Sequence, residues 1–139
     1  MRRRFPALCL VLALAAFSAA ACDDENDPPT TPNTPPPTVT ESFTGSLNPG
    51  GGGVTFAFTV AANGQVTATL VELSSSAVPV SLSLGNWNRS VCQVVLANDN
   101  AVQGTFVTGS MSAAGSLCVR LGSGNLESPV TFRVDVVHP

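Results

Sequence analysis

The feature that most constrains the fold is the alternation of apolar and polar residues in short runs along the C-terminal two thirds of the chain. In the clearest run, Val54, Phe56, Phe58 and Val60 alternate with threonine and alanine. Glycine, asparagine and serine separate the runs, and none of the runs shows the 3.6-residue period of an amphipathic helix. The pattern therefore predicts half-buried β-strands joined by turns.

About eight strands are expected, and they indicate a single antiparallel β-sandwich. Asn63-Gly64 predicts a hairpin between the second and third strands, and Pro79 indicates either an edge strand or the start of a strand. The last strand is predicted to bury Val130, Phe132, Val134 and Val136 and to expose Thr131, Arg133 and Asp135. The expected strands are residues 42–47, 54–60, 66–70, 78–84, 91–96, 102–111, 117–121 and 130–137.

Four segments together resemble the bacterial pre-peptidase C-terminal domain: residues 54–70, the Val-Ser-Leu-Ser-Leu run at 80–84, residues 113–121 and the final alternating strand. The resemblance covers about residues 41 to 138 and implies a jelly-roll-like β-sandwich. Members of that family usually serve as accessory domains of secreted proteases, and some bind polymeric substrates or calcium. This chain carries no peptidase, so the accessory role of the family cannot be transferred to it as it stands.

Residues 1–21 have the three-part build of an export signal. Three arginines at positions 2–4 are followed by an apolar stretch and then by small residues at 18–21. The apolar segment 8–21 has fourteen residues, or about 21 Å as a helix, which is short of the roughly 30 Å hydrocarbon core of a bilayer. We therefore expect a cleaved signal peptide rather than a permanent membrane span.

Cys22 directly follows this leader, and the approach Ser18-Ala19-Ala20-Ala21-Cys22 resembles the lipobox of bacterial lipoproteins. The resemblance implies that Cys22 is lipidated and becomes the mature N-terminus, so that a lipid anchors the protein to the membrane. The alanines also fit the A-x-A site of the ordinary signal peptidase, which would leave Cys22 unmodified and the protein secreted.

Residues 22–40 form a linker between the leader and the β domain at residues 41–139. The linker begins with four acidic residues and continues with six prolines between positions 28 and 37. Such a segment cannot bury enough apolar surface to fold, so it is expected to be a disordered, polyproline-like stalk. A docking site for a proline-binding domain is the alternative interpretation.

The inventory of ionisable residues disfavours an enzyme and a nucleic-acid partner. The chain has no lysine and no tyrosine, and its single histidine, His138, is one residue from the end. From Cys22 onward three arginines face nine acidic residues, a side-chain balance of −6. An acidic surface without a basic stripe argues against nucleic acid, and no cofactor or metal is expected.

Cys92 and Cys118 are predicted to form a disulfide, because export removes them from reducing conditions. A free thiol or a metal site is the alternative. Cys118 is out of phase with the apolar residues Leu117 and Val119, whereas Cys92 shares the phase of Val94 and Leu96. The pair is therefore expected at a strand end.

Asn86, Trp87, Asn88 and Arg89 are the candidate recognition residues. An indole flanked by amides and a guanidinium can stack on a sugar or on a partner's aromatic ring, although Trp87 could instead close one end of the sandwich. The nearby stretch Asn98-Asp99-Asn100 carries oxygen ligands that suit calcium, but a polar turn is the simpler interpretation.

These observations predict a noncatalytic lipoprotein of the bacterial envelope, exported and anchored on the periplasmic or cell-surface side of a membrane. Its β-sandwich would bind an envelope protein or a glycan from the end of a flexible stalk. A structural spacer of the envelope and a secreted soluble binding module are the alternatives.

Overall fold

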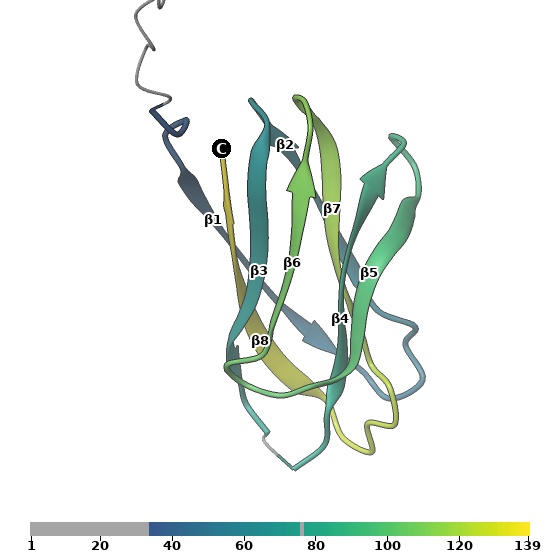
Figure 1. The fold of residues 1–139 in the computed structure, drawn as a ribbon. Helices are drawn as coiled ribbons and strands as arrows, with labels where there is room; N and C mark the ends of the chain where they lie inside the picture. The colour runs from purple at the N-terminus through teal and green to yellow at the C-terminus, as the bar shows by residue number, and fades with distance from the viewer. Residues whose placement is uncertain (1–33, 76) are drawn as a thin grey trace, which may run out of the picture. The chain divides into compact units, whose positions relative to one another are not determined.

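The computed structural model describes residues 34–75 and 77–139, which form two antiparallel four-stranded sheets (Figure 1). The signal peptide, Cys22 and the linker as far as residue 33 lie outside the described residues. The strands are β1 (Val39–Leu47), β2 (Val54–Val60), β3 (Gly64–Leu73), β4 (Val80–Trp87), β5 (Cys92–Ala101), β6 (Phe106–Met111), β7 (Gly115–Gly122) and β8 (Val130–His138).

The order of the strands is that of a jelly roll. One sheet has the order β1-β8-β3-β6 and the other has the order β2-β7-β4-β5. Two Greek keys wound together produce this arrangement, so the predicted jelly-roll-like sandwich is confirmed. At one side of the sandwich β1 lies against β2, and at the other side β6 lies against β4 and β5.

The core between the sheets follows the alternation in the sequence. On β8, Val130, Phe132, Val134 and Val136 are all buried, while the residues between them are at least partly exposed. On the β1 and β2 side the core is aromatic, because the ring of Phe43 stacks on Phe56 at a centroid distance of 5.0 Å. The edge strands β5 and β6 contribute no aromatic side chain to this core.

The predicted hairpin at Asn63-Gly64 is wrong. The turn exists, but β2 pairs with β7 while β3 pairs with β6 and β8, so the turn carries the chain from one sheet to the other. The backbone N–H of Ala61 donates to the carbonyl oxygen of Pro139 at 3.1 Å. The C-terminus therefore takes up a hydrogen bond that a local hairpin would have used.

Several strand ends differ from the predicted ones. β1 begins at Val39, three residues before the predicted start, and so includes two residues assigned to the linker. Pro79 directly precedes β4, which lies between β7 and β5, so the proline marks a strand start and not an edge strand. β5 continues to Ala101, and the residues after it form a turn closed by a hydrogen bond from the Thr105 N–H to the Val102 carbonyl at 2.9 Å.

Candidate functional site

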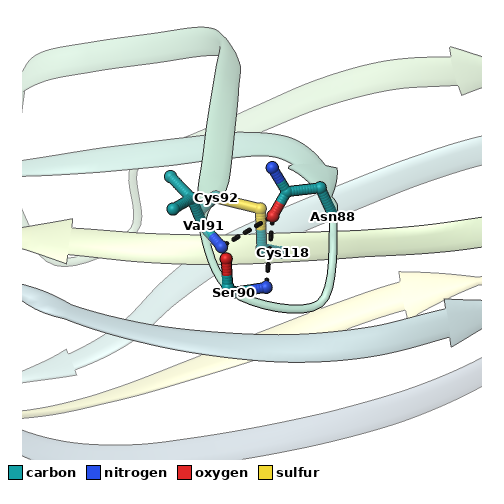
Figure 2. Close-up of a disulfide and its surroundings, with 5 residues drawn as sticks. All are labelled: Asn88, Ser90, Val91, Cys92 and Cys118. Carbon is teal, nitrogen blue, oxygen red and sulfur yellow. Dashed lines mark hydrogen bonds between the residues drawn. A yellow bond between two sulfur atoms is a disulfide. The ribbon is translucent and has the colours of Figure 1, made fainter.

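The four predicted recognition residues lie at the connection between β4 and β5. Asn86 and Trp87 are the last two residues of β4, and Asn88 and Arg89 begin the turn. The side-chain Oδ1 of Asn88 accepts hydrogen bonds from the backbone N–H groups of Ser90 at 3.1 Å and Val91 at 2.8 Å (Figure 2). This oxygen shapes the turn, and only Arg89 among the non-glycine residues described has a positive φ, of 79°.

A disulfide between Cys92 and Cys118 fixes the end of this turn (Figure 2). The two Cα atoms are 5.8 Å apart, within the usual range for such a bond. The predicted pairing is therefore confirmed, and these two residues are neither free thiols nor a metal site. Cys92 is at a strand end as expected, whereas Cys118 lies in the middle of β7 and is fully buried.

The disulfide joins strands that are not neighbours, because β4 lies between β5 and β7. With strands about 4.8 Å apart, residues two strands away should be separated by about 9.5 Å, which is too far for a disulfide. Gly85 removes this obstacle. A Cβ atom there would lie 2.7 Å from the carbonyl carbon of Gln93 and 2.9 Å from the Cα of Val94. The missing side chain lets the start of β5 pass close over β4 and brings Cys92 to Cys118.

A β-bulge at Val95 accompanies this close approach. Leu84 pairs with Leu96, and the next residue, Gly85, pairs with Val94, so Val95 is an extra residue on β5. A bulge shifts the phase of a strand by one residue. Val94 therefore shares the outward phase of Gly85, and Leu96 shares the core-facing phase of Leu84. The prediction that Cys92 shares one face with Leu96 is wrong because alternation does not continue through the bulge.

The bulge borders an apolar groove at the side of the sandwich where β5 and β6 are the edge strands. Val95 and Leu96, although consecutive, both line the groove, and Val95 is 65% exposed. The groove has a volume of 220 Å³. Its lining residues come from both sheets and contain no ionisable side chain: Val66, Leu84, Gly85, Asn86, Val95, Leu96, Gly109, Ser110, Met111 and Leu117.

Only Asn86 of the four predicted recognition residues lines this groove. Trp87 is half-buried and lies opposite Cys92 in the register of the two strands, while Arg89 is exposed in the turn. The four residues therefore do not form one site: Asn86 lines the groove, Trp87 ends β4, and Asn88 and Arg89 lie in the turn. The consecutive apolar residues Val95 and Leu96 are a weak indication of the groove, because they interrupt the alternation of a half-buried strand.

The stretch Asn98-Asp99-Asn100 lies inside β5 and not in a turn. The carboxylate Oδ1 of Asp99 accepts a hydrogen bond from the Ser81 hydroxyl at 2.8 Å, and the Oδ1 of Asn98 accepts one from the Asn100 N–H at 2.9 Å. These oxygens therefore bond to neighbouring protein groups. Within residues 34–75 and 77–139, no three histidine, cysteine, aspartate or glutamate residues gather in a way that could hold a metal ion.

His138 is buried in the last strand, β8. Its Nε2 lies 3.0 Å from the Oε1 of Glu41 on β1, and its Nδ1 lies 3.1 Å from the carbonyl oxygen of Pro139. The ring also packs on Phe58, with centroids 5.2 Å apart. Each ring nitrogen of His138 therefore has a protein oxygen within hydrogen-bond distance, one from Pro139 and one from Glu41.

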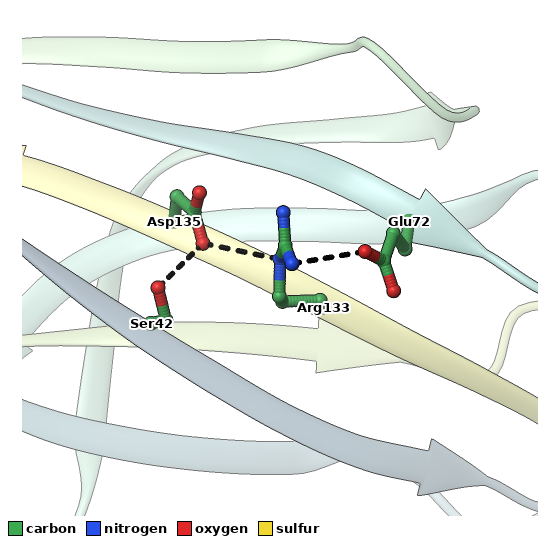
Figure 3. Close-up of polar contacts among 4 residues, drawn as sticks. All are labelled: Ser42, Glu72, Arg133 and Asp135. Carbon is green, nitrogen blue, oxygen red and sulfur yellow. Dashed lines mark hydrogen bonds and ion pairs between the residues drawn. The ribbon is translucent and has the colours of Figure 1, made fainter.

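A second polar cluster lies on the outer face of the β1-β8-β3-β6 sheet (Figure 3). Arg133 Nη1 is 2.9 Å from Glu72 Oε1, and the Ser42 hydroxyl donates to Asp135 Oδ1 at 2.8 Å. Arg133 Nε is 3.5 Å from the same aspartate oxygen, an ionic contact without hydrogen-bond geometry. The side chains of Arg133 and Glu72 are 41% and 61% exposed, so solvent screens their attraction and the contribution to stability is small.

No family model matches the chain, and a search of curated proteins finds no match. The resemblance to the pre-peptidase C-terminal domain therefore stays a prediction from the sequence pattern. Within the part of the chain that the structure describes, no helix has the length and apolar character needed to cross a membrane.

Proposed function

We propose that the protein is a noncatalytic binding module of the bacterial envelope, exported by its leader, anchored by a lipid on Cys22 and held at a distance from the membrane by its proline-rich linker. The apolar segment of the leader, residues 8–21, is too short to span a bilayer, and a cysteine follows it directly. A lipidated cysteine with two or more acyl chains is sufficient for stable attachment.

The observation that carries the binding role is the uncharged groove between β5 and β6. Two of its lining residues are exposed apolar side chains, Val95 at 65% and Leu96 at 37%. Clustered exposed apolar residues on a soluble domain mark interaction sites. The groove contains no aromatic ring on which a sugar could stack and only two polar side chains, those of Asn86 and Ser110. This lining favours an apolar protein segment over a glycan.

Lipid attachment is tested by feeding radiolabelled palmitate to bacteria that express the full chain. We expect label in the wild type and none in Cys22→Ala, because the thiol of residue 22 is the proposed attachment point. Label that persists in Cys22→Ala, or its absence from both proteins, would contradict the proposed anchor. Intact mass of the wild type gives a second readout, since cleavage before Cys22 removes the first 21 residues.

Binding through the groove is tested by photo-cross-linking in intact cells. A benzoylphenylalanine at Val95 should give discrete protein adducts, because this side chain lines the groove and is exposed. The matched control carries benzoylphenylalanine in place of Val39, which begins β1 and is 51% exposed. Adducts of equal yield from both positions, or none from Val95, would contradict a binding role for the groove.

A further inference from the structure

The groove opens between two strand edges that are left unpaired in the fold. Among the residues that the structure describes, β6 pairs only with β3, and β5 pairs only with β4. The edge of a sheet presents a row of unpaired backbone N–H and C=O groups to any extended chain beside it. The two edges differ, however. The pairing of β5 with β4 shifts register between Val80 and Leu82 and again between Leu84 and Gly85. The pairing of β6 with β3 is continuous from Gly64 to Thr69.

β6 lacks the features that usually protect an edge strand from pairing. Its residues, Phe106 to Met111, include no charged residue and no proline, and its register with β3 has no bulge. The bulges of β5 twist that edge away and make it a poor template. An incoming strand would therefore add to β6 and not to β5.

We propose that an extended segment of a partner protein adds to β6 as a fifth strand of its sheet and inserts neutral apolar side chains into the groove against Val95 and Leu96. This inference rests on the proposed function and names the ligand class of the same site. Side chains on one face of a strand recur about every 6.8 Å, so alternate residues of the segment would enter the groove. The volume of 220 Å³ is below the roughly 300 Å³ of the smallest drug-sized sites, and it suits side chains better than a cofactor.

Charge supports an uncharged segment as the occupant. No ionisable residue lines the groove, while Glu72, Arg133 and Asp135 are gathered on the outer face of the sheet that contains β6. A charged side chain placed in the groove would lose water without gaining a partner. The residues of the segment that face inward must therefore be neutral and apolar.

A second copy of this chain does not fit the groove. If β6 paired with β6 of another copy, the inward residues Val107 and Met111 of that copy would already be packed in its own core. Gly109, the inward residue between them, has no side chain to offer. Only a segment that is not already part of a sheet can supply free apolar side chains.

The test uses the purified full chain in lipid nanodiscs and a fluorescent peptide of five Thr-Val repeats with two lysines at each end. We expect saturable binding by fluorescence anisotropy, and no binding of the matched Thr-Asp peptide or of empty nanodiscs. Two further peptides carry N-methyl groups on all valine amides or on all threonine amides. Because alternate N–H groups of a strand point to opposite edges, one methylated peptide should lose binding and the other should retain it.

Two variants locate the site. Val95→Asp should weaken peptide binding at least tenfold, whereas Val39→Asp, at an exposed valine on β1, should leave it unchanged; thermal unfolding confirms that both variants are folded. Equal binding of both methylated peptides would overturn strand addition while leaving groove binding intact. Absence of peptide binding would also overturn strand addition, as would a dimer of the chain that Val95→Asp abolishes. In either case the cross-linking from Val95 remains a separate test of the proposed binding role.

Discussion

Replacing both Cys92 and Cys118 by alanine should lower the free energy of unfolding by about 3–4 kcal/mol. The disulfide closes a loop between residues that are 26 positions apart, and a cross-link of this length restricts the unfolded chain by that amount in the chain-entropy model. The loss is large for a domain of this size, since such domains are stable by only about 5–15 kcal/mol. Urea unfolding of wild type and variant, followed by tryptophan fluorescence, measures the difference.

A reductant provides the matched control for the disulfide. Reduction should destabilise the wild type by a similar amount and should leave the double alanine variant unchanged. The tight turn around Asn88 should survive in the variant, because its hydrogen bonds do not depend on the sulfur atoms. A wild type whose unfolding midpoint is the same with and without reductant would show that the cross-link contributes nothing.

Gly85→Ala is expected to have the second large effect, a loss of about 3 kcal/mol, at the upper end for overpacking. The added Cβ would meet the backbone of Gln93 and Val94, and backbone cannot move aside as a flexible side chain can. The start of β5 must shift away from β4, which also moves Cys92 away from Cys118. We therefore expect a lower thermal midpoint together with a fraction of molecules whose two thiols remain free after oxidative refolding.

Gly115→Ala is the matched control, since Gly115 is also in a strand of the same sheet. A Cβ there would meet only the terminal methyl of Met111, at 3.2 Å, and this flexible end can move. The substitution should be neutral or slightly stabilising, because alanine restricts the unfolded chain more than glycine does. Equal midpoints for Gly85→Ala and Gly115→Ala would rule out the close passage of β5 over Gly85 as a stabilising feature.

The sequence predicted the fold well where the alternation is uninterrupted. Residues 54–60 form a strand with the predicted bounds, and the buried face of β8 includes the four expected residues together with His138. Period-two alternation is a local property of a half-buried strand, so it can be read without knowing the partner strand. The hairpin at Asn63-Gly64 was wrong because a turn signal says nothing about which strands pair.

The candidate site was predicted less well, for a related reason. The candidate residues Asn86 to Arg89 were expected in the loop between the strands at 78–84 and 91–96, but Asn86 and Trp87 belong to β4, and only Asn86 reaches the groove. The groove depends on a bulge at Val95 and on Gly109 facing Leu96 from the other sheet. A bulge has no strong sequence signal, and residues that meet across two sheets share no spacing in the chain.

The sequence by itself determined the period of the strands and therefore an all-β sandwich, and it predicted that Cys92 and Cys118 would form a disulfide. Only the tertiary structure decided that β5 crosses close over Gly85, that the aromatic side chains close one side of the sandwich, and that β6 is left with an open edge beside an apolar groove. The physical reason is that alternation depends on neighbours two residues apart, whereas the groove depends on strands whose positions are fixed by long-range pairing.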